Sequence, residues 1–399
     1  MDKKILHCDL NSFFASVELL EHPELADLPV AVCGDPKKRR GIILAKNEAA
    51  KKYGVKTAEP IPQALRKCPG LRLLPANHGK YGEFSRKANE IYLRFTNRVE
   101  PFGIDESWLD VTMSPKSFGS AEHIAEAIRK TVKAELGLTV SVGVSFNKIF
   151  AKLGSDLKKP DATTVISREN FREKIWPLPP GELLFIGKST AEELARMGIR
   201  TIGGLAEADV GRLARKFGVH ARQMRDAANG IADDSVAFYG EERGARSVGN
   251  SVTFDHDLFG EDEIAAGLAE IADKVCDRLK EEGCAASTVR VTIKTPNLKS
   301  IQRQSTMPSP TDLRRTIFAE ALRLAKSANA HQYPVRLLGI ACSNLEDAPK
   351  RQLRLFGDDG DTRLECAEEA ALKVRRKFGR DALKSARSLL SKNGKTPEA

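Results

Sequence analysis

Residues 4–18 read KILHCDLNSFFASVE, and the first seven positions do not alternate regularly between apolar and polar side chains. Such a run is typical of a strand that is buried on both faces. We therefore expect a strand over residues 1–12, followed by a helix that Ser12 caps and that reaches Glu18. Asp9 then lies at the carboxyl end of the strand, where many α/β proteins bind their ligands.

A second acidic stretch, FGIDESWLDV, occupies residues 102–111. Successive side chains on a straight strand point to opposite faces, so Asp105 and Glu106 can face one site only at a hairpin bend or a bulge. Together with Asp9, this pair would give three carboxylates, a set of hard oxygen ligands suited to Mg²⁺. Two such ions about 3.5–4 Å apart support in-line phosphoryl transfer. Ordinary surface acids at strand ends are the alternative.

Composition limits the class of protein. The chain has 399 residues, too many for one compact domain, and 41% of them are hydrophobic, which excludes wholesale disorder. The formal net charge of +10 indicates a polyanionic partner, most commonly nucleic acid. We predict neither a membrane span, which needs roughly 20 apolar residues, nor a secretory signal, and hence a cytoplasmic protein without a membrane partner.

The cysteines and histidines exclude two kinds of site. The seven cysteines include no CxxC pair, so we expect reduced thiols. The seven histidines are scattered, which argues against a zinc site built on histidine. Any catalytic metal ion should therefore be held by carboxylates.

The chain divides by pattern into several segments. Residues 23–76 are basic and interrupted by prolines, and residues 77–170 alternate between strand and helix patterns. After a proline-marked boundary, residues 181–236 have a purely helical pattern. Residues 245–345 give the order strand, helix, strand, strand, helix, strand, which indicates a small α/β sandwich. The tail, 346–399, ends in a helix with a heptad-like apolar stripe made of Leu364, Ala367, Ala371, Val374 and Phe378.

The acidic motifs resemble those of a known enzyme family. Residues 9–18 resemble the opening motif of Y-family DNA polymerases, and residues 104–110 resemble their second catalytic motif. The order and spacing of the motifs also match, as do the downstream residues 145–148, 151–152 and 158–160. The similarity runs from residue 1 to about 345 and is closest to the DNA polymerase IV type of these translesion enzymes.

The resemblance implies an α+β multidomain fold, the right hand of the Y-family polymerases. The catalytic palm would comprise residues 1–12 and 77–170, and the small fingers residues 13–76. A helical thumb with a helix-hairpin-helix would occupy residues 171–236, followed by a linker over 237–244. An α/β little finger would span 245–345, and the tail would carry a clamp-binding motif at 352–356.

The resemblance also assigns the site residues. Asp9, Asp105 and Glu106, with the main-chain carbonyl of Leu10, would hold two Mg²⁺ ions. Nucleotide-binding roles would fall to Ser12, Phe13, Phe14, Lys51 and Lys159. Phe14 is aligned with the steric gate that excludes a ribose 2′-hydroxyl, and a core phenylalanine at helical spacing is the alternative.

The predicted fingers depart from the family pattern at three positions. The family usually has threonine, tyrosine and arginine where this chain has Ala45, Glu48 and Lys51. Lysine keeps the charge of arginine but not its bidentate fork, and Glu48 cannot replace a phenol as a donor to phosphate. Lys51 resembles the lysine-containing pattern of the polymerase V catalytic subunit. These departures bear on triphosphate affinity rather than on the metal chemistry.

Two other regions are predicted to bind DNA. The turn at residues 186–188 resembles a helix-hairpin-helix, which offers main-chain amides to phosphates, although Phe185 replaces the usual first glycine. Residues 283–311 of the predicted little finger contain basic residues but no Asp or Glu. Arg290, Thr292 and Lys294 share one strand face there, which suits binding to phosphates. A plain helical hairpin and a solvated strand face are the alternatives. The DNA-binding candidates are Gly187, Lys188, Arg290, Lys294, Lys299 and Arg303.

A short motif predicts a protein partner. The segment QLRLF at 352–356 resembles the bacterial sliding-clamp peptide, whose apolar side chains fill a cleft while glutamine sets the register. Its contacts would be Gln352, Leu353, Leu355 and Phe356.

The expected function is template-directed DNA synthesis of low fidelity across damaged templates, by two-metal nucleotidyl transfer from dNTPs to a primer 3′-hydroxyl. Its partners would be primer–template DNA, dNTPs and the sliding clamp, for a monomer associated with the bacterial nucleoid. One alternative is a catalytically weakened, DNA-binding relative similar to the polymerase V subunit. The other is a nucleotidyl cyclase, although cyclases need no units that grip DNA.

Overall fold

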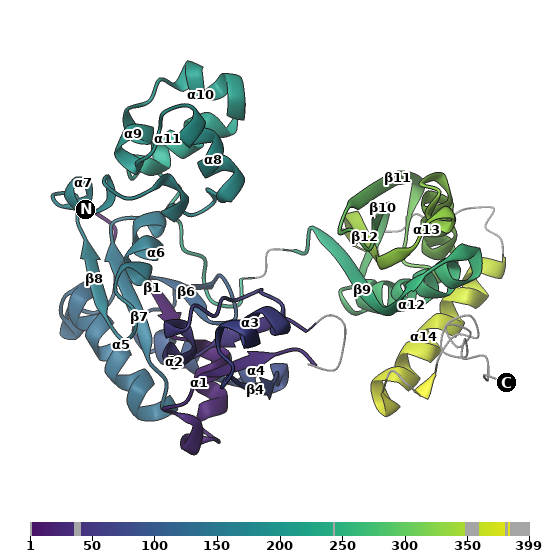
Figure 1. Cartoon of the computed structure of the whole chain (residues 1–399), viewed down its shortest axis with the longest axis horizontal. Coiled ribbons are helices and arrows are strands. Elements are labelled where there is room, and N and C mark those ends of the chain that lie inside the picture. The colour runs from purple at the N-terminus through teal and green to yellow at the C-terminus, as the bar shows by residue number, and fades with distance from the viewer. Residues whose placement is uncertain (1, 36–40, 242–243, 348–358, 380–381, 384–399) are drawn as a thin grey trace. The chain divides into compact units, whose positions relative to one another are not determined.

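The computed structural model describes residues 2–35, 41–241, 244–347, 359–379 and 382–383 (Figure 1). The chain forms two compact units, Met1–Glu242 and Arg243–Ala399. None of the described helices is both long enough and apolar enough to cross a membrane.

A five-stranded sheet forms the centre of the first unit. Its strand order is β5-β6-β1-β7-β8, with β1 antiparallel to both β6 and β7, and β7 parallel to β8. All six residues of β1 are buried, which confirms the predicted strand with two covered faces. The strands are β1 (Ile5–Leu10), β5 (Val99–Pro101), β6 (Glu106–Asp110), β7 (Val140–Ser145) and β8 (Thr163–Ile166).

Helices cover both faces of this sheet. Helices α4 (His78–Leu93) and α5 (Ala121–Leu136) share a core with the valines of β7 on one face. Helix α6 (Lys148–Leu157) packs on the other face, against the small residues of β7. A Cβ atom at Gly143 would lie 1.9 Å from the carbonyl oxygen of Ala151. Glycine at this position therefore lets α6 approach the sheet closely.

A three-stranded sheet in the order β3-β2-β4 follows β1 in the chain. Its strands are β2 (Val30–Cys33), β3 (Ile43–Lys46) and β4 (Arg72–Pro75), and its helices are α1 (Phe13–Leu19), α2 (Glu48–Lys52) and α3 (Ile61–Lys67). Ser12 holds the N-cap position of α1, but its side chain makes no capping hydrogen bond. The prediction of a capping serine is wrong because Ser12 is left-handed (φ 49°), and a capping side chain normally needs an extended main chain.

The last part of the first unit is helical and shares a core with α6. It contains α7 (Phe171–Ile175), α8 (Lys188–Arg196), α9 (Ile202–Glu207), α10 (Val210–Phe217) and α11 (His220–Ala228). Short 3-10 turns elsewhere in the unit lie at Pro23–Leu25, Lys116–Phe118 and Pro180–Glu182.

The prediction of a purely helical segment up to residue 236 is wrong beyond α11. Residues 231–238 have no regular structure and run along the five-stranded sheet, where Val236 is buried beside Ile5. The main-chain N–H of Lys148 donates to Asp234 Oδ1 at 3.1 Å, and the Asn147 side chain donates to the Gly230 carbonyl at 3.0 Å. These hydrogen bonds take the place of helical ones.

The second unit has the predicted order of elements. These are β9 (Ser247–Leu258), α12 (Gly260–Glu281), β10 (Cys284–Lys294), β11 (Ser300–Thr311), α13 (Arg314–Ser327) and β12 (Val335–Asp347), with a 3-10 turn at Ala330–Gln332. The sheet is antiparallel in the order β11-β10-β12-β9. Val289, Val291 and Ile293 of β10 are buried in one core with both helices.

Helix α14 (Asp359–Phe378) packs on α12 and α13. The predicted apolar stripe is wrong in its last turns, because Val374 and Phe378 are 38% and 67% exposed, whereas Leu372 is buried. Polar contacts hold the helix: Arg375 pairs with Asp277 at 2.9 Å, and Glu368 accepts a hydrogen bond from the main-chain N–H of Arg314 at 3.1 Å. The predicted clamp-binding residues 352–356 lie outside the described residues.

Candidate active site

The two acidic motifs meet where β1 and β6 lie side by side. Asp9 is the direct cross-strand partner of Glu106. Asp105 lies in the turn that leads from β5 into β6, and its carbonyl accepts a hydrogen bond from the main-chain N–H of Leu10 at 3.0 Å. The predicted hairpin bend is therefore confirmed, and the carboxylate-bearing residues 9, 105 and 106 come together.

A buried histidine adjoins this site. His7 shares the face of β1 that carries Asp9, because side chains two residues apart on a strand point the same way. Its Nε2 lies 3.1 Å from Glu106 Oε2, and its Nδ1 lies 2.9 Å from Ser155 Oγ. Burial lowers the pKa of His7, which favours the neutral ring. Sequence reasoning missed His7, although its spacing of two from Asp9 was a usable signal.

Within the described part of the chain, one group of potential metal ligands stands out. Ligand atoms of His7, Asp9 and Glu106 all lie within 4.8 Å of one another. Asp105 is not a member of this group, although its carboxylate feels the charges of Asp9 and Glu106. The structure thus groups Asp9 and Glu106 with His7 and places Asp105 at the adjoining turn.

Two lysines neutralise part of the acidic charge. Lys152 Nζ lies 3.0 Å from Asp9 Oδ2, 3.0 Å from Glu106 Oε2 and 3.1 Å from Asp156 Oδ2. Lys159 Nζ lies 2.8 Å from Asp9 Oδ2 and 2.9 Å from Asp156 Oδ1. The predicted residue Lys159 therefore lies at the carboxylates. Lys152 was part of the family resemblance but had no assigned role, and Asp156 is an addition that only the fold reveals.

The carboxylates differ in their electrostatic environment. Burial, with the charges of Asp9 and Glu106, raises the pKa of Asp105 to about 6. Burial also disfavours ionised Glu106, but its contact with His7 and the charge of Lys152 outweigh this and lower its pKa to about 2. Hard divalent cations prefer carboxylate oxygens as ligands. A bound cation would offset the repulsion that Asp9 and Glu106 exert on ionised Asp105. The residues therefore fit a divalent metal site.

Aromatic rings follow directly after the acidic strand. Phe13 is buried in the core of the first unit, whereas Phe14 is only partly buried and stacks on Tyr81. The hydroxyl of Tyr81 donates to Glu18 Oε1 at 2.6 Å. Phe13 is therefore the core residue of the pair, and Phe14 presents a ring that is available for contact.

The three departures from the family pattern lie around α2. Ala45 packs against the core of the first unit, and Asn47 caps α2 through its side chain. Lys51 pairs with Glu48 at 3.6 Å, and both side chains are about half exposed. The role of Lys51 stays a prediction.

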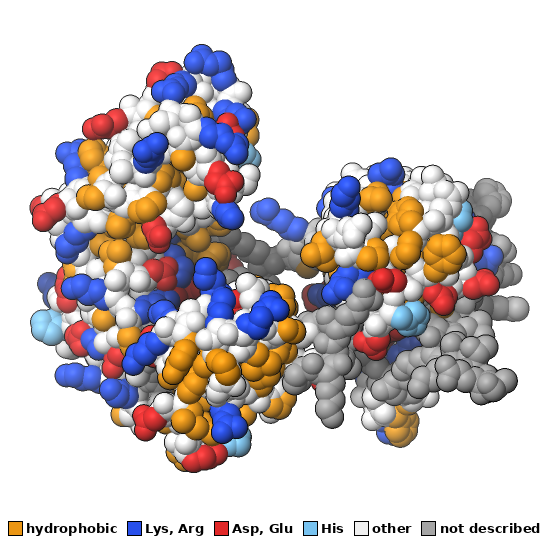
Figure 2. Space-filling model, in the orientation of Figure 1, with side chains coloured by type: hydrophobic (Ala, Val, Ile, Leu, Met, Phe, Trp, Pro, Cys, Tyr) orange, Lys and Arg blue, Asp and Glu red, His pale blue; other side chains and the backbone are white. Residues whose placement is uncertain are grey.

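The predicted DNA-binding turn precedes α8. Phe185 is left-handed (φ 70°) and 82% exposed, so the turn keeps the conformation for which glycine is usual. Gly187 is the N-cap residue of α8, and the side chain of Lys188 is 91% exposed. Figure 2 shows Lys and Arg side chains, in blue, over the surface of the helices α8–α11. This surface is suited to a polyanion.

The register of the second unit divides its basic residues between two faces. Arg290 lies opposite Gln304 and Lys294 opposite Ser300, and these side chains share the face away from the helices. Arg303 lies opposite the buried Val291, and directly opposed residues point to the same side of a sheet. Arg303 therefore does not share the face of Arg290 and Lys294, although it is exposed on the edge strand β11. Its DNA-binding role stays a prediction. Lys299 is exposed in the turn before β11.

Comparison with known proteins agrees with the geometry. Residues 8–156 match the impB/mucB/samB family, and residues 245–355 match the C-terminal domain of that family. The chain is 44% identical to DNA polymerase IV of Acetivibrio thermocellus, over 95% of this chain and 96% of the relative. It is 37% identical to DNA polymerase IV 1 of Bacillus subtilis, over 98% of this chain and 94% of the relative.

A solved structure of a chimaeric Y-family DNA polymerase has the same fold. It matches with a TM-score of 0.75 at 23% identity, over 86% of this chain and 99% of that one. The chain therefore belongs to the Y family of DNA polymerases and, within it, to the DNA polymerase IV group. Members of this family use divalent metal ions.

Proposed function

We propose that the chain is a DNA-directed DNA polymerase of low fidelity that performs translesion synthesis, adding dNTPs to the primer 3′-hydroxyl of primer–template DNA. The observation that carries this proposal is the meeting of Asp9, Asp105 and Glu106 at one end of β1 and β6, in a chain of this family. Palm, fingers, thumb and little finger would be the segments assigned above.

The metal site would take two Mg²⁺ ions. Asp9, Asp105, Glu106 and the carbonyl of Leu10 would be the protein ligands, and the bound ions would stabilise charge on the attacking and leaving oxygens. Lys159 would meet the triphosphate, and its position 2.8 Å from Asp9 supports this role. Main-chain N–H groups at the start of α1, from Ser12 to Phe14, would assist, as would Lys51.

The ring of Phe14 would act as the steric gate. A partly exposed ring can oppose a 2′-hydroxyl by contact alone, which is selection by repulsion. Phe13 cannot serve in its place because it is buried in the core.

DNA would be held by surfaces that carry no sequence information. Gly187 holds the N-cap position of α8, and Lys188 adds an exposed cation that lies 3.8 Å from Glu192. Arg290, Lys294 and Lys299 would add a basic sheet face and turn. We further propose that residues 352–356 bind the bacterial sliding clamp, and that the protein acts as a monomer at the nucleoid in the bacterial cytoplasm.

Primer extension opposite an abasic site, with Mg²⁺ and dNTPs, tests the proposal. The wild type should extend the primer, and Asp105→Asn should not. Asp110→Asn, at the far end of the strand β6 that follows Asp105, is the matched control and should extend normally. Equal extension by the wild type and Asp105→Asn would overturn the metal assignment. No extension by any of the three would favour the DNA-binding relative suggested by Ala45 and Glu48.

A further inference from the structure

Lys159 lies in a loop without regular structure. The loop, residues 158–162, joins α6 to β8, yet it brings the ammonium group of Lys159 to 2.8 Å from Asp9 Oδ2. A group that must meet a substrate phosphate works best when its position is fixed in advance. The contacts that fix residues 158–162 therefore also fix the position of Lys159.

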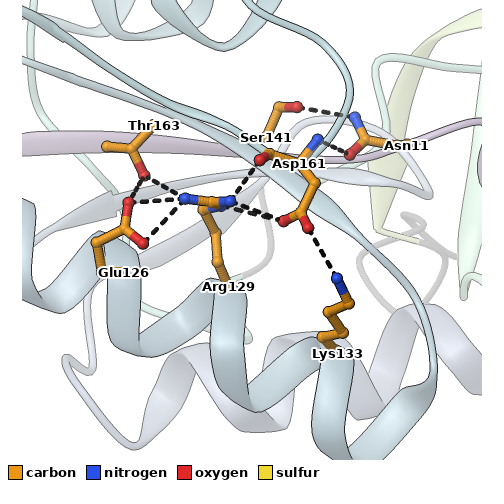
Figure 3. A network of polar contacts seen from close by, with 7 residues as sticks. All are labelled: Asn11, Glu126, Arg129, Lys133, Ser141, Asp161 and Thr163. Carbon is orange, nitrogen blue, oxygen red and sulfur yellow. Dashed lines mark hydrogen bonds and ion pairs between the residues drawn. The ribbon is translucent and has the colours of Figure 1, made fainter.

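Asp161 is the fixed point of the loop (Figure 3). Its main-chain N–H donates to Asn11 Oδ1 at 2.8 Å, and its carbonyl accepts a hydrogen bond from Arg129 Nη2. Its carboxylate accepts from the same guanidinium at 3.0 Å and pairs with Lys133 at 3.2 Å. Asp161 is left-handed (φ 52°), a conformation that persists only where neighbouring contacts hold it.

Arg129 is itself held in place. Its Nη1 donates to both oxygens of Glu126, at 2.7 and 2.9 Å, and Thr163 donates to the same carboxylate at 2.7 Å. The arginine side chain is only 19% exposed. A planar guanidinium can serve Asp161 and Glu126 together, whereas a lysine ammonium lacks this fork.

Asn11 connects the loop to the acidic strand. It lies two residues after Asp9, is 6% exposed and donates through Nδ2 to Ser141 Oγ at 2.9 Å. Its other amide atom accepts from Asp161. One buried side chain therefore ties the end of β1, which carries Asp9, to the loop that carries Lys159 (Figure 3).

We propose that Arg129 and Asn11 are positioning residues, which act through Asp161 to hold Lys159 beside Asp9, where the triphosphate of the incoming nucleotide binds. This inference rests on the proposed function. It goes beyond it by naming residues that act on Lys159 only through Asp161 and so set the affinity for the nucleotide.

Single-nucleotide insertion kinetics of Arg129→Met, Lys159→Met and the double variant provide the test. Each single variant should raise KM for the dNTP by about tenfold with a smaller change in kcat, a factor within the reach of one hydrogen bond to a charged group. The double variant should be no worse than Lys159→Met, because both changes remove the same contact. Arg129→Lys, which keeps the charge but not the fork, should fall in between.

Two variants serve as matched controls. Lys133→Met removes the exposed partner of Asp161, and Arg94→Met removes an exposed arginine paired with Glu135 on α5. Both should leave KM within about twofold, since exposed ion pairs contribute little. Hydrogen exchange of the peptide containing residues 158–162 gives a readout without catalysis, and it should be faster in Arg129→Met and Asn11→Leu only.

The outcomes separate the two proposals. An unchanged KM in Arg129→Met, or effects of Arg129→Met and Lys159→Met that multiply in the double variant, would overturn the positioning role. An unchanged KM in Lys159→Met would instead remove the role given to Lys159 in the proposed function. Should Arg129→Met fold poorly, Arg129→Lys and the exchange measurement decide the matter.

Discussion

The ring of Phe14 lies nearly flat on the ring of Tyr81, with centroids 4.1 Å apart and planes inclined by 12°. Tyr81 is fully buried, and its hydroxyl is bonded to Glu18, a residue of the same helix as Phe14. The proposed gate therefore stands against a fixed surface. The stacked Tyr81 ring should keep the Phe14 ring from moving aside when a sugar with a 2′-hydroxyl binds.

Phe14→Ala should raise the incorporation of ribonucleotides relative to deoxyribonucleotides by roughly tenfold or more, since one lost steric contact changes selectivity by such factors. The ratio of kcat/KM for the two sugars measures the effect. Phe13→Leu is the control, because Phe13 belongs to the core and should affect stability without changing the ratio. Unchanged discrimination in Phe14→Ala would show that another residue selects the sugar.

Asp105→Asn should stabilise the metal-free protein at neutral pH. The folded protein raises the pKa of Asp105 to about 6 from 3.8, so ionisation is penalised in the folded state. The penalty is complete above pH 6 and vanishes below pH 3.8, where folded and unfolded chains are both protonated. We expect a gain of about 1–3 kcal/mol at pH 7.5 in urea melts with a chelator, closing towards pH 4.

Asp110→Asn, at the far end of the neighbouring strand β6, provides the contrast. Its Oδ1 accepts a hydrogen bond from the main-chain N–H of Thr112 at 2.9 Å, so removing the charge should not stabilise the protein. Equal gains from Asp105→Asn and Asp110→Asn would mean that the crowding of carboxylates around Asp9 is not the cause.

Arg290→Ala should reduce the salt dependence of duplex binding. Each phosphate contact that is lost lowers the slope of log K against log salt by about 0.9. Arg303→Ala is the matched control, because this arginine lies on the opposite face of the same sheet. Anisotropy titrations of labelled primer–template from about 50 to 200 mM salt measure both slopes. Equal losses in the two variants would contradict the assignment of one binding face.

Gly143→Ala should destabilise the protein strongly, by several kcal/mol, because a Cβ would overlap the carbonyl of Ala151. Gly82→Ala, in helix α4 with open space around it, should instead add about 0.5–1 kcal/mol. Urea melts of both variants measure the two effects. Comparable stabilities would show that α6 can move away from the sheet at little cost.

Local pattern predicted much of this fold. The lack of regular alternation in β1, the strand and helix order of the second unit and the bend at Asp105 all depend on neighbours in sequence, and the structure confirms them. The convergence of Asp9 with Glu106 followed from the resemblance to Y-family motifs rather than from spacing alone. Local reasoning failed for Ser12, where the main chain turns left-handed, and beyond Ala228, where contacts with Asn147 and Lys148 replace helical ones.

Register and distant partners could not be read from the sequence. The face of Arg303 depends on which residue of β10 it opposes, and that is set by the turn between the strands. Lys152 and Arg129 lie far along the chain from Asp9 and Asn11, so only the packing of α5 and α6 on the sheet makes them neighbours. His7 is the exception, because its alternation with Asp9 was visible.

The packing of α14 on α12 and α13 affects how a C-terminal truncation of this protein should be interpreted. Ending the chain after β12 would delete Glu368 and Arg375, and α13 would lose the acceptor at its first turn while Asp277 would lose a cation. If activity fell after such a truncation, the loss could come from lower stability of the second unit or from loss of the proposed clamp contact, and the two causes could not be separated. Point substitutions at Leu355 and Phe356 leave Glu368 and Arg375 in the chain, and they therefore test the proposed clamp contact without deleting α14.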